Sequence, residues 1–318
     1  MVIENVRMGT LEKPWGSGHL GPWNAVNPNT SPIGELWFER TAECASEASL
    51  LLKLLFTSQP LSIQVHPTDA FAHALGLTHG KTEAWYILSA IGGSKVAVGL
   101  TRSLTAKQLR DAIIDGSIAD LVQWRPVAKG DVIFVPAGTI HALGAGLIVA
   151  EVQQRSDTTF RLFDFGRGRA LDVDNAVNGA YAGPADHQLI SSPLDDVRIL
   201  LVACEQFTLE LIDLPPLSRW EFFSEKETWI FTLQGYASLG EIGAKAGEAV
   251  FLQMASAPLN VGAEGFKCLV AYADRRPNFN LLRNLKRENG DSAAREFSCN
   301  LALHESKNSW VRSAGVER

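Results

Sequence analysis

The chain has 318 residues, of which 46% are hydrophobic and 20% are charged, and its formal net charge is −6. This composition is typical of a globular protein. It argues against a general binder of nucleic acid or anionic membranes, because the overall field repels anions. An anionic substrate would therefore need a local cationic pocket.

The cysteines and the N-terminal segment indicate in which cellular compartment the protein is expected. Cys44, Cys204, Cys268 and Cys299 form no CxxC pair, which is typical of reduced cysteines. Residues 1–16 lack the apolar core of a secretory leader, and the apolar runs are too short to span a bilayer. We therefore expect a cytoplasmic protein, with neither nucleic acid nor a membrane as its partner.

Short strand-like segments, separated by turn residues, dominate the first half of the chain. They are residues 49–58, 61–67, 81–90, 94–100, 130–143 and 146–154. The period changes in residues 105–123, where Leu109, Ile113 and Ile114 recur at helical spacing behind Thr105, a plausible N-cap. The sequence thus predicts a mainly β fold with a small helical insertion near 105–123.

The strand patterns of the first half recur after a Pro-, Gly- and Ser-rich stretch at 180–196, the best candidate for a linker. Residues 227–237, ETWIFTLQGYA, resemble residues 83–93, EAWYILSAIGG. Residues 246–255 resemble residues 129–138 in the same way. Because the segments recur in the same order, we expect a duplicated β domain.

This repeat predicts how the chain is divided. We expect a first, catalytic domain over 1–180 and a second domain over 181–275. The second copy has no counterpart of His66 or His141, so we expect it to be degenerate. Residues 276–318 read as a C-terminal extension of poor order.

The segment LSIQVHP carries the first candidate site residues. Ser62, Gln64 and His66 alternate with apolar residues, so in a strand they share one face. That face is either an ordinary solvent-facing edge or one half of a metal site. Glu83 enters the next strand, and His141 follows a turn in the segment GDVIFVPAGTIH. Imidazole nitrogens with carboxylate or amide oxygens are typical ligands of open zinc sites.

The spacing of Gly130, Pro136, Gly138 and His141 resembles the second motif of the cupins, which are small double-sheeted β-barrels with a metal inside. The resemblance extends to one cupin family. The segments LSIQVHP, GKTEAWYIL, VPAGTIHAL and EVQQRSDTTFRLFDFGR, with PWG and GELWFE nearer the N-terminus, together resemble type I mannose-6-phosphate isomerase in its short bacterial form. The family is also called phosphomannose isomerase. The resemblance implies two cupin-type β-barrel (jelly-roll) domains, the second degenerate.

The resemblance also implies an activity and the residues that perform it. The activity is zinc-dependent interconversion of D-mannose 6-phosphate and D-fructose 6-phosphate through an enediol. One zinc ion per chain would be held by Gln64, His66, Glu83 and His141. The implied catalytic residues are Lys81, Glu151 and Arg161, and those that bind the sugar phosphate are Trp15, Ser62 and Arg167.

Two departures leave the proton-transfer residue open between Lys81 and Glu151. Many members have a histidine where this chain has Gly80, and a tyrosine where it has Leu143. Two other functions also stay open. An iron-dependent cupin dioxygenase would prefer more histidine ligands, and a non-catalytic sugar-binding cupin would be expected to have lost metal ligands.

Several of these residues also have an ordinary structural interpretation. Lys81 alone reads as a solvated charge at a strand edge, and Glu151 as half of a surface ion pair with Arg155 or Arg161. Trp85 and Trp229 recur in both copies, so we expect them to be core residues and not sugar platforms. Asp157 reads as a turn residue.

Overall fold

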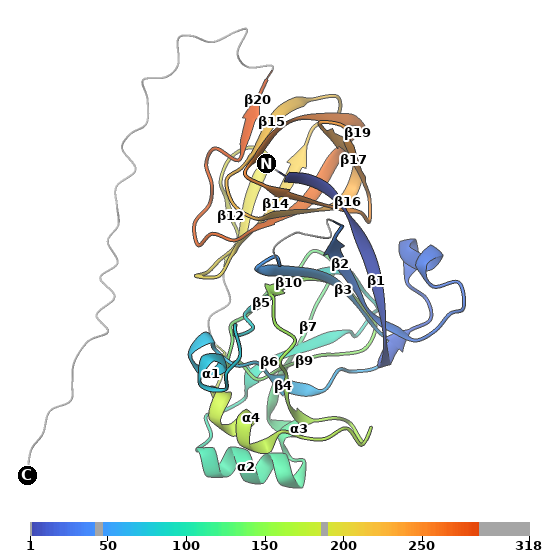
Figure 1. The fold of residues 1–318 in the computed structure, drawn as a ribbon. Coiled ribbons are helices and arrows are strands. Elements are labelled where there is room, and N and C mark those ends of the chain that lie inside the picture. The colour runs from blue at the N-terminus through green and yellow to red at the C-terminus, as the bar shows by residue number, and fades with distance from the viewer. Residues whose placement is uncertain (1, 42–46, 186–189, 286–318) are drawn as a thin grey trace, which may run out of the picture.

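The computed structural model describes residues 2–41, 47–185 and 190–285. The chain is mainly β, as predicted (Figure 1). Most of the expected C-terminal extension lies outside the described residues, as do Cys44 and Cys299. Within the described ranges, no helix combines the length and the apolar character that a membrane crossing requires.

Two antiparallel sheets make up the first half of the chain. The larger sheet contains β1 (Val2–Ser17), β2 (Ile33–Arg40), β3 (Leu50–Thr57), β10 (Leu147–Gln154), β5 (Glu83–Ala90) and β8 (Val132–Val135), in that spatial order. The smaller sheet contains β11 (Phe160–Phe163), β4 (Ile63–Val65), β9 (His141–Leu143), β6 (Lys95–Leu100) and β7 (Val122–Pro126). Side chains from both sheets line one polar cavity, so the sheets face each other across it.

Helices cover the face of the smaller sheet that points away from the cavity (Figure 1). They are α1 (Asp69–Ala74), α2 (Ala106–Asp115), α3 (Ile118–Leu121) and α4 (Val173–Gly179), while a 3-10 helix, η1 (Gly21–Val26), lies earlier in the chain. The packed face of the sheet presents residues such as Ile63, Val65 and Ala142 to buried helix residues such as Leu109. Gln64 alternates with these residues and therefore points to the cavity.

The predicted insertion at 105–123 is confirmed as α2 and α3. The Thr105 side chain accepts a hydrogen bond from the amide of Gln108, whose side chain accepts one from the amide of Thr105, as in a capping box. One residue of the predicted apolar face of this helix, Ile114, is not buried. Ile113 is buried, but Ile114 is 69% exposed, because it lies 100° further around the helix.

The larger sheet is buried on both faces at its central strand, β3. Every residue of β3 is buried. Leu52, Leu54 and Phe56 join a core cluster that also contains Trp229 and Phe231 from the second half of the chain. Lys53 and Leu55, which alternate with them, line the cavity. The second half therefore covers the back of the sheet whose front carries the site.

The second half of the chain forms a further set of antiparallel strands. They are β12 (Ser192–Pro193), β13 (Arg198–Ala203), β14 (Thr208–Leu214), β15 (Arg219–Ser224), β16 (Thr228–Leu239), β17 (Ile242–Lys245), β18 (Ala249–Gln253), β19 (Ala255–Tyr272) and β20 (Leu282–Asn284). The repeated segments become neighbouring strands in each half, β5 with β8 and β16 with β18, which supports the duplication. The domain boundaries stay a prediction. The start of β1, Val2–Asn5, pairs with β18 and so joins the two halves.

Candidate metal centre

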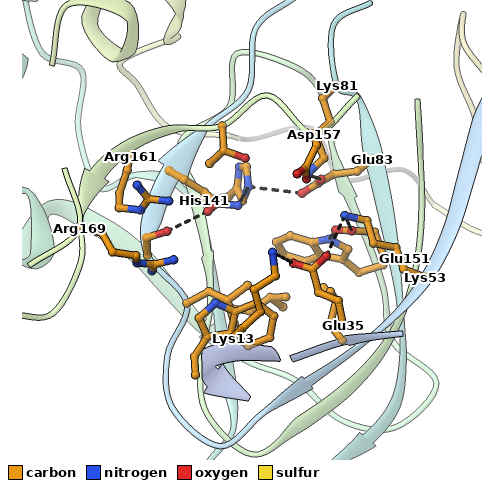
Figure 2. A pocket seen from close by; sticks show the side chains of 18 residues that line it. Lys13, Glu35, Lys53, Lys81, Glu83, His141, Glu151, Asp157, Arg161 and Arg169 are labelled. Atoms are coloured by element: carbon orange, nitrogen blue, oxygen red, sulfur yellow. Dashed lines mark hydrogen bonds and ion pairs between the residues drawn. The ribbon is translucent and has the colours of Figure 1, made fainter. Parts of the chain in front are cut away.

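A cavity of about 220 Å³ lies between the two sheets of the first half (Figure 2). The predicted site residues that line it are Trp15, Ser62, Gln64, Lys81, Glu83, His141, Glu151 and Arg161. The wall also includes charged residues that the sequence analysis did not select as site residues: Lys13, Glu35, Lys53, Asp157 and Arg169. The sequence therefore predicted the wall near His141 better than the opposite wall.

Three of the four predicted metal ligands form one tight, buried cluster. One ligand atom each from His66, Glu83 and His141 lies within 4.8 Å of the other two. Glu83 Oε2 is 3.4 Å from His66 Nε2, and its Oε1 is 3.3 Å from His141 Nε2. These residues come from the end of β4 and the starts of β5 and β9, so the two facing sheets both contribute.

The fourth predicted ligand, Gln64, meets the same cluster. Its Nε2 is 3.5 Å from His66 Nε2 and 3.3 Å from His141 Nε2, while its Oε1 accepts a hydrogen bond from Ser62 Oγ. The two ends of an amide have nearly the same shape, and a hydroxyl can either donate or accept. Turning the amide by 180° therefore presents Oε1 to the two imidazoles and keeps a contact with Ser62.

Backbone carbonyls orient both imidazoles. His66 Nδ1 donates to the carbonyl of Thr158 at 2.8 Å, and His141 Nδ1 donates to that of Thr139 at 2.8 Å. With Nδ1 as the donor, the lone pair of each Nε2 points into the cluster. Burial lowers the pKa of His66 to about 3, with a further lowering by the charge of Lys81, and burial also lowers the pKa of His141. Both rings are therefore neutral, as metal ligands must be.

The Glu83 carboxylate fits a bound cation. It is 1% exposed, yet neither oxygen accepts a well-formed hydrogen bond from any residue that the structure describes. Burial alone would raise the pKa of Glu83, but the adjacent charge of Lys81 holds it well below its usual range. The Lys81 ammonium lies 2.9 Å from Glu83 Oε2 and 3.0 Å from His66 Nε2. A positive charge thus already lies against the atoms that a metal ion would use.

Lys81 is a buried residue of this centre, so its interpretation as a solvated strand-edge charge is wrong. Burial alone would lower its pKa, but the charges of Glu83 and Glu151 outweigh burial and raise it. The side chain is therefore an ammonium group in this environment. It can donate hydrogen bonds to an anionic or carbonyl oxygen in the cavity.

Glu151 is buried in the cavity wall, so a surface ion pair with an arginine is also wrong. The indole of Trp85 donates to its Oε1 at 2.9 Å, and Lys53 Nζ lies 3.3 Å from its Oε2. Burial, and then the negative charge of Glu83, raise the pKa of Glu151. A carboxyl group with a raised pKa is suited to exchange a proton near neutral pH. Trp85 is a core residue, as expected, but it also forms part of the wall.

Lys13, Glu35 and Lys53 form the opposite wall (Figure 2). The Glu35 carboxylate lies 3.0 Å from Lys13 Nζ and 3.7 Å from Lys53 Nζ. The sequence did contain a signal for Lys53, which is the one charged residue in the apolar run LLLKLLF. A lysine is seldom fully buried unless it is paired, so a lysine in such a strand indicates a polar site.

A group of arginines lies at another side of the cavity, where Figure 2 shows Arg161 and Arg169. Arg161 donates to the carbonyl of Ala170 at 3.0 Å, and its buried Nε has no partner among the described residues. Arg169 forms an ion pair with Asp164. Asp157, which was read as a turn residue, lines the cavity as well.

The structure does not bring Arg167 into the cavity wall. Its guanidinium donates to the carbonyl of Pro60 at 2.8 Å and to Asp164 at 2.9 Å. Positive φ angles at Phe165 and Gly166 turn the chain just before it. Because the segment RGR places two arginines close together, sequence alone did not reveal which of them faces the cavity.

Two facing antiparallel sheets around a cluster of histidines and a carboxylate define a cupin-type fold, and solved structures share this architecture. The structure of mannose 6-phosphate isomerase from Bacillus subtilis superposes with a TM-score of 0.72 at 23% identity, covering 84% of this chain and 98% of that one. A zinc-bound mannose 6-phosphate isomerase superposes with a TM-score of 0.66 at 18% identity, covering 86% and 99%. The predicted cupin fold is thereby confirmed.

Sequence comparison gives more specific relatives. The chain is 38% identical over 157 residues to mannose-6-phosphate isomerase of Streptococcus mutans, which covers 46% of this chain and 49% of the relative. It is 42% identical over 120 residues to mannose-6-phosphate isomerase ManA of Bacillus subtilis, covering 37% and 38%. The match thus spans about half the length of these relatives or less. No protein-family model matches the chain. The predicted resemblance to mannose-6-phosphate isomerases is confirmed.

Proposed function

We propose that this chain is a zinc-dependent aldose–ketose isomerase that interconverts D-mannose 6-phosphate and D-fructose 6-phosphate. The observation that carries the proposal is the convergence of Gln64, His66, Glu83 and His141 in one buried cluster. Three of them, Gln64, Glu83 and His141, line a cavity that also holds a buried lysine and a buried glutamate. The names of the similar proteins support the same reaction and the same metal.

The donor set suits zinc in an open site. Two neutral imidazoles, one carboxylate and one amide oxygen would hold the ion, with the Gln64 amide turned so that Oε1 faces it. The chemistry that a bound zinc ion supplies is Lewis-acid polarisation of a sugar oxygen, worth several kcal/mol. Thr158 and Thr139 fix the direction of the two imidazoles through their carbonyls.

Isomerisation moves one proton between neighbouring carbons through an enediol, and Glu151 is the group we propose for that transfer. Burial and the charge of Glu83 raise its pKa, which makes its carboxylate a stronger base than an exposed one. The pKa of Lys81 is raised, which makes it a weak base but a good donor to a sugar oxygen that gains negative charge. The structure thus favours Glu151 over Lys81, an order that the sequence left open.

The cavity also provides positive charge for a phosphate dianion. We propose that Arg169 and Arg161 attract the phosphate, and that Ser62 and Trp15, which also line the cavity, contact the sugar phosphate. Guanidinium groups suit this role, because they bind phosphate oxygens in a planar, bidentate way. The predicted role of Arg167 would need its guanidinium to leave Asp164 and Pro60.

The proposal is tested by measuring the metal content and sugar-phosphate isomerisation of the same purified protein. We expect one zinc ion per chain, turnover of mannose 6-phosphate, loss of turnover on chelation, and recovery on adding zinc. His141→Ala should lose both metal and turnover. If purified protein of full metal content left mannose 6-phosphate unchanged, the isomerase assignment would be wrong. Iron with oxygen uptake would indicate the dioxygenase alternative, and sugar binding without turnover the non-catalytic one.

A further inference from the structure

Gln153 is a buried amide beside the proposed metal centre. It lies on β10, two residues after Glu151, so it points to the same side of the sheet, and it pairs in register with Glu83 on β5. It is 0% exposed and does not line the cavity. Its Oε1 has no hydrogen-bond partner among the described residues. An unsatisfied buried acceptor costs about 1–3 kcal/mol, so an apolar residue of the same shape would pack at lower cost.

The other end of the amide holds the loop that follows β10. Gln153 Nε2 donates to the carbonyl of Ser156 at 2.6 Å and to that of Gln154 at 2.9 Å. Both acceptors belong to the chain as it leaves β10 and turns toward β11. The side chain therefore ties this loop to the strand that it has just left.

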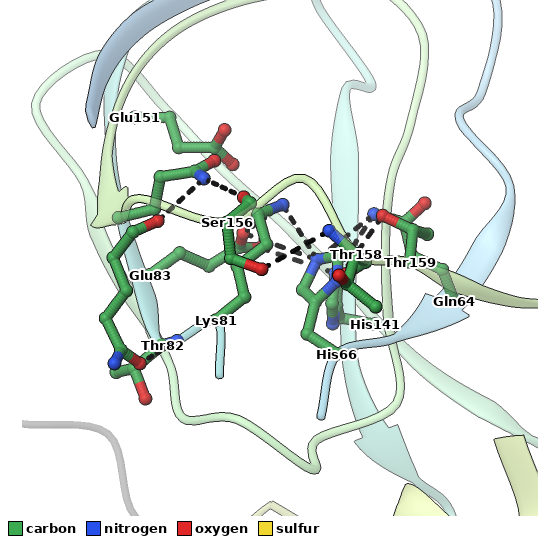
Figure 3. A network of polar contacts seen from close by, with 12 residues as sticks. Gln64, His66, Lys81, Thr82, Glu83, His141, Glu151, Ser156, Thr158 and Thr159 are labelled. Carbon is green, nitrogen blue, oxygen red and sulfur yellow. Dashed lines mark hydrogen bonds and ion pairs between the residues drawn. The ribbon is translucent and has the colours of Figure 1, made fainter. Parts of the chain in front are cut away.

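The same loop orients a proposed metal ligand. Two residues beyond Ser156, the carbonyl of Thr158 accepts the Nδ1–H of His66 at 2.8 Å (Figure 3). This contact selects the tautomer whose Nε2 lone pair faces Glu83 and Gln64. A shift of the loop would move the Thr158 carbonyl away from the His66 ring. The proton of His66 could then lie on either nitrogen, and the ring could rotate.

His66 and His141 differ in whether a distant loop fixes the orientation of the ring. His141 donates to Thr139, which is only two residues away, so the start of its own strand fixes its ring. His66 donates to a carbonyl 92 residues away in sequence.

The loop that carries this carbonyl is held by several contacts. The amide of Thr158 donates to Ser156 Oγ at 3.4 Å, the amide of Arg155 donates to the carbonyl of Ser49 at 2.8 Å, and β11 pairs with β4 from Phe160 onward. Gln153 adds a fully buried side-chain donor that bonds the loop at Ser156.

We infer that Gln153 is a positioning residue of the metal centre, which holds the Thr158 carbonyl against His66 Nδ1 by bonding the loop at Ser156. The inference rests on the proposed metal-dependent function. The direct hydrogen-bond partner of a metal ligand, here the Thr158 carbonyl, usually contributes a factor of about 10–100 to metal affinity, and Gln153 acts through this partner. Gln153→Met removes the donors and keeps the shape of the side chain, so its zinc dissociation constant should rise by about this factor.

The test compares zinc affinity in metal-free wild type, Gln153→Met and a matched control. Leu147→Met introduces the same side chain at a buried position on the same strand face of β10, away from the loop. Competition with a chromophoric chelator should show weaker zinc binding by Gln153→Met and unchanged binding by Leu147→Met. Equal affinity of Gln153→Met and wild type would overturn the inference and leave the proposed function standing. A wild type that binds no zinc would overturn both.

A second readout needs no folded variant. In metal-free wild type, imidazole ¹⁵N spectra should show the proton of His66 on Nδ1. Gln153→Met, and the shorter Gln153→Asn, should show a mixture of tautomers for His66 and an unchanged spectrum for His141. A proton on Nε2 of His66 in the wild type would contradict the inference even if neither variant folds.

Discussion

At the scale of single residues, the centre is a set of buried charges that balance one another. Glu83 and Glu151 are both buried, and their charges both act on Lys81. Their environments push their pKa values in opposite directions, down for Glu83 and up for Glu151. One carboxyl group is therefore kept ionised, as the proposed ligand role requires, while the other is a stronger base, as the proposed proton transfer requires.

The acidic side of the pH profile should depend on Lys53. Its charge lowers the pKa of Glu151 and so opposes the effect of burial. Lys53→Met removes that charge, so the pKa of Glu151 should rise. If Glu151 acts as the base, kcat/KM will fall at a higher pH than in wild type as the solution is acidified. Lys13→Met is the matched control, because Lys13 pairs with Glu35 and not with Glu151. An unmoved acidic limb in Lys53→Met would exclude Glu151 as the titrating base.

The two neighbouring arginines allow a matched comparison of phosphate binding. Arg169→Met should raise KM for the sugar phosphate by about 10-fold or more, because a charge-assisted contact contributes roughly 1.5–3 kcal/mol. Arg167→Met should have a smaller effect, because both arginines pair with Asp164 but only Arg169 lines the cavity. Steady-state kinetics of the two variants measure which substitution raises KM more. A larger rise in KM for Arg167→Met would restore the role predicted from sequence.

At the scale of elements, alternation along the strands made much of the site predictable. Gln64 lies on β4, His66 directly follows that strand, and Glu83 begins β5, so period-2 reasoning grouped them correctly. The same reasoning did not reveal Glu35 and Lys53. Lys53 lies on β3, which pairs with the distant strand β10, and pairing across such a distance is not visible in local patterns. Glu35 lies on β2 with Glu39 at the same parity, and the local pattern did not show which of these glutamates is buried. The two short helices α1 and α4 were also missed, because each has too few residues to show a period.

Two neighbouring isoleucines of helix α2 allow a prediction about stability and its control. Ile113 is buried against the smaller sheet, whereas Ile114 is exposed. Ile113→Ala should lower the free energy of unfolding by about 2–5 kcal/mol, because it leaves a cavity. Ile114→Ala should change it by less than about 0.5 kcal/mol. Urea unfolding measures both, and equal effects would show that the helix is rotated relative to the face described above.

At the scale of the whole molecule, the second half of the chain supports the first. The repeated glutamate shows how the two copies have diverged. Glu83 faces the proposed metal site, while its counterpart Glu227 accepts hydrogen bonds from the amides of Ser49 and Leu50 at 2.5 and 2.8 Å. The second copy thus uses the same residue to bind the start of β3. Trp229, the counterpart of Trp85, donates to Glu227 and lies in the shared core.

The shared core should make the two halves unfold together. Phe231 from the second half packs on Phe38 from the first, with ring centroids 5.6 Å apart. Phe231→Ala should therefore lower the stability of the whole chain by about 3–5 kcal/mol. Denaturation followed by tryptophan fluorescence and by far-ultraviolet circular dichroism should show one coincident transition in wild type and variant. A variant in which only part of the signal shifts would show that the halves unfold separately.

The central claim is that four side chains from the two facing sheets bind one divalent ion. Anomalous X-ray diffraction at the zinc edge, on crystals of protein purified without chelator, tests it most directly. The account predicts one strong peak in the cavity at about 2.0–2.2 Å from His66 Nε2, His141 Nε2, a Glu83 oxygen and Gln64 Oε1. A zinc-replete protein with no peak in this cavity, or with its zinc bound by other residues, would contradict it.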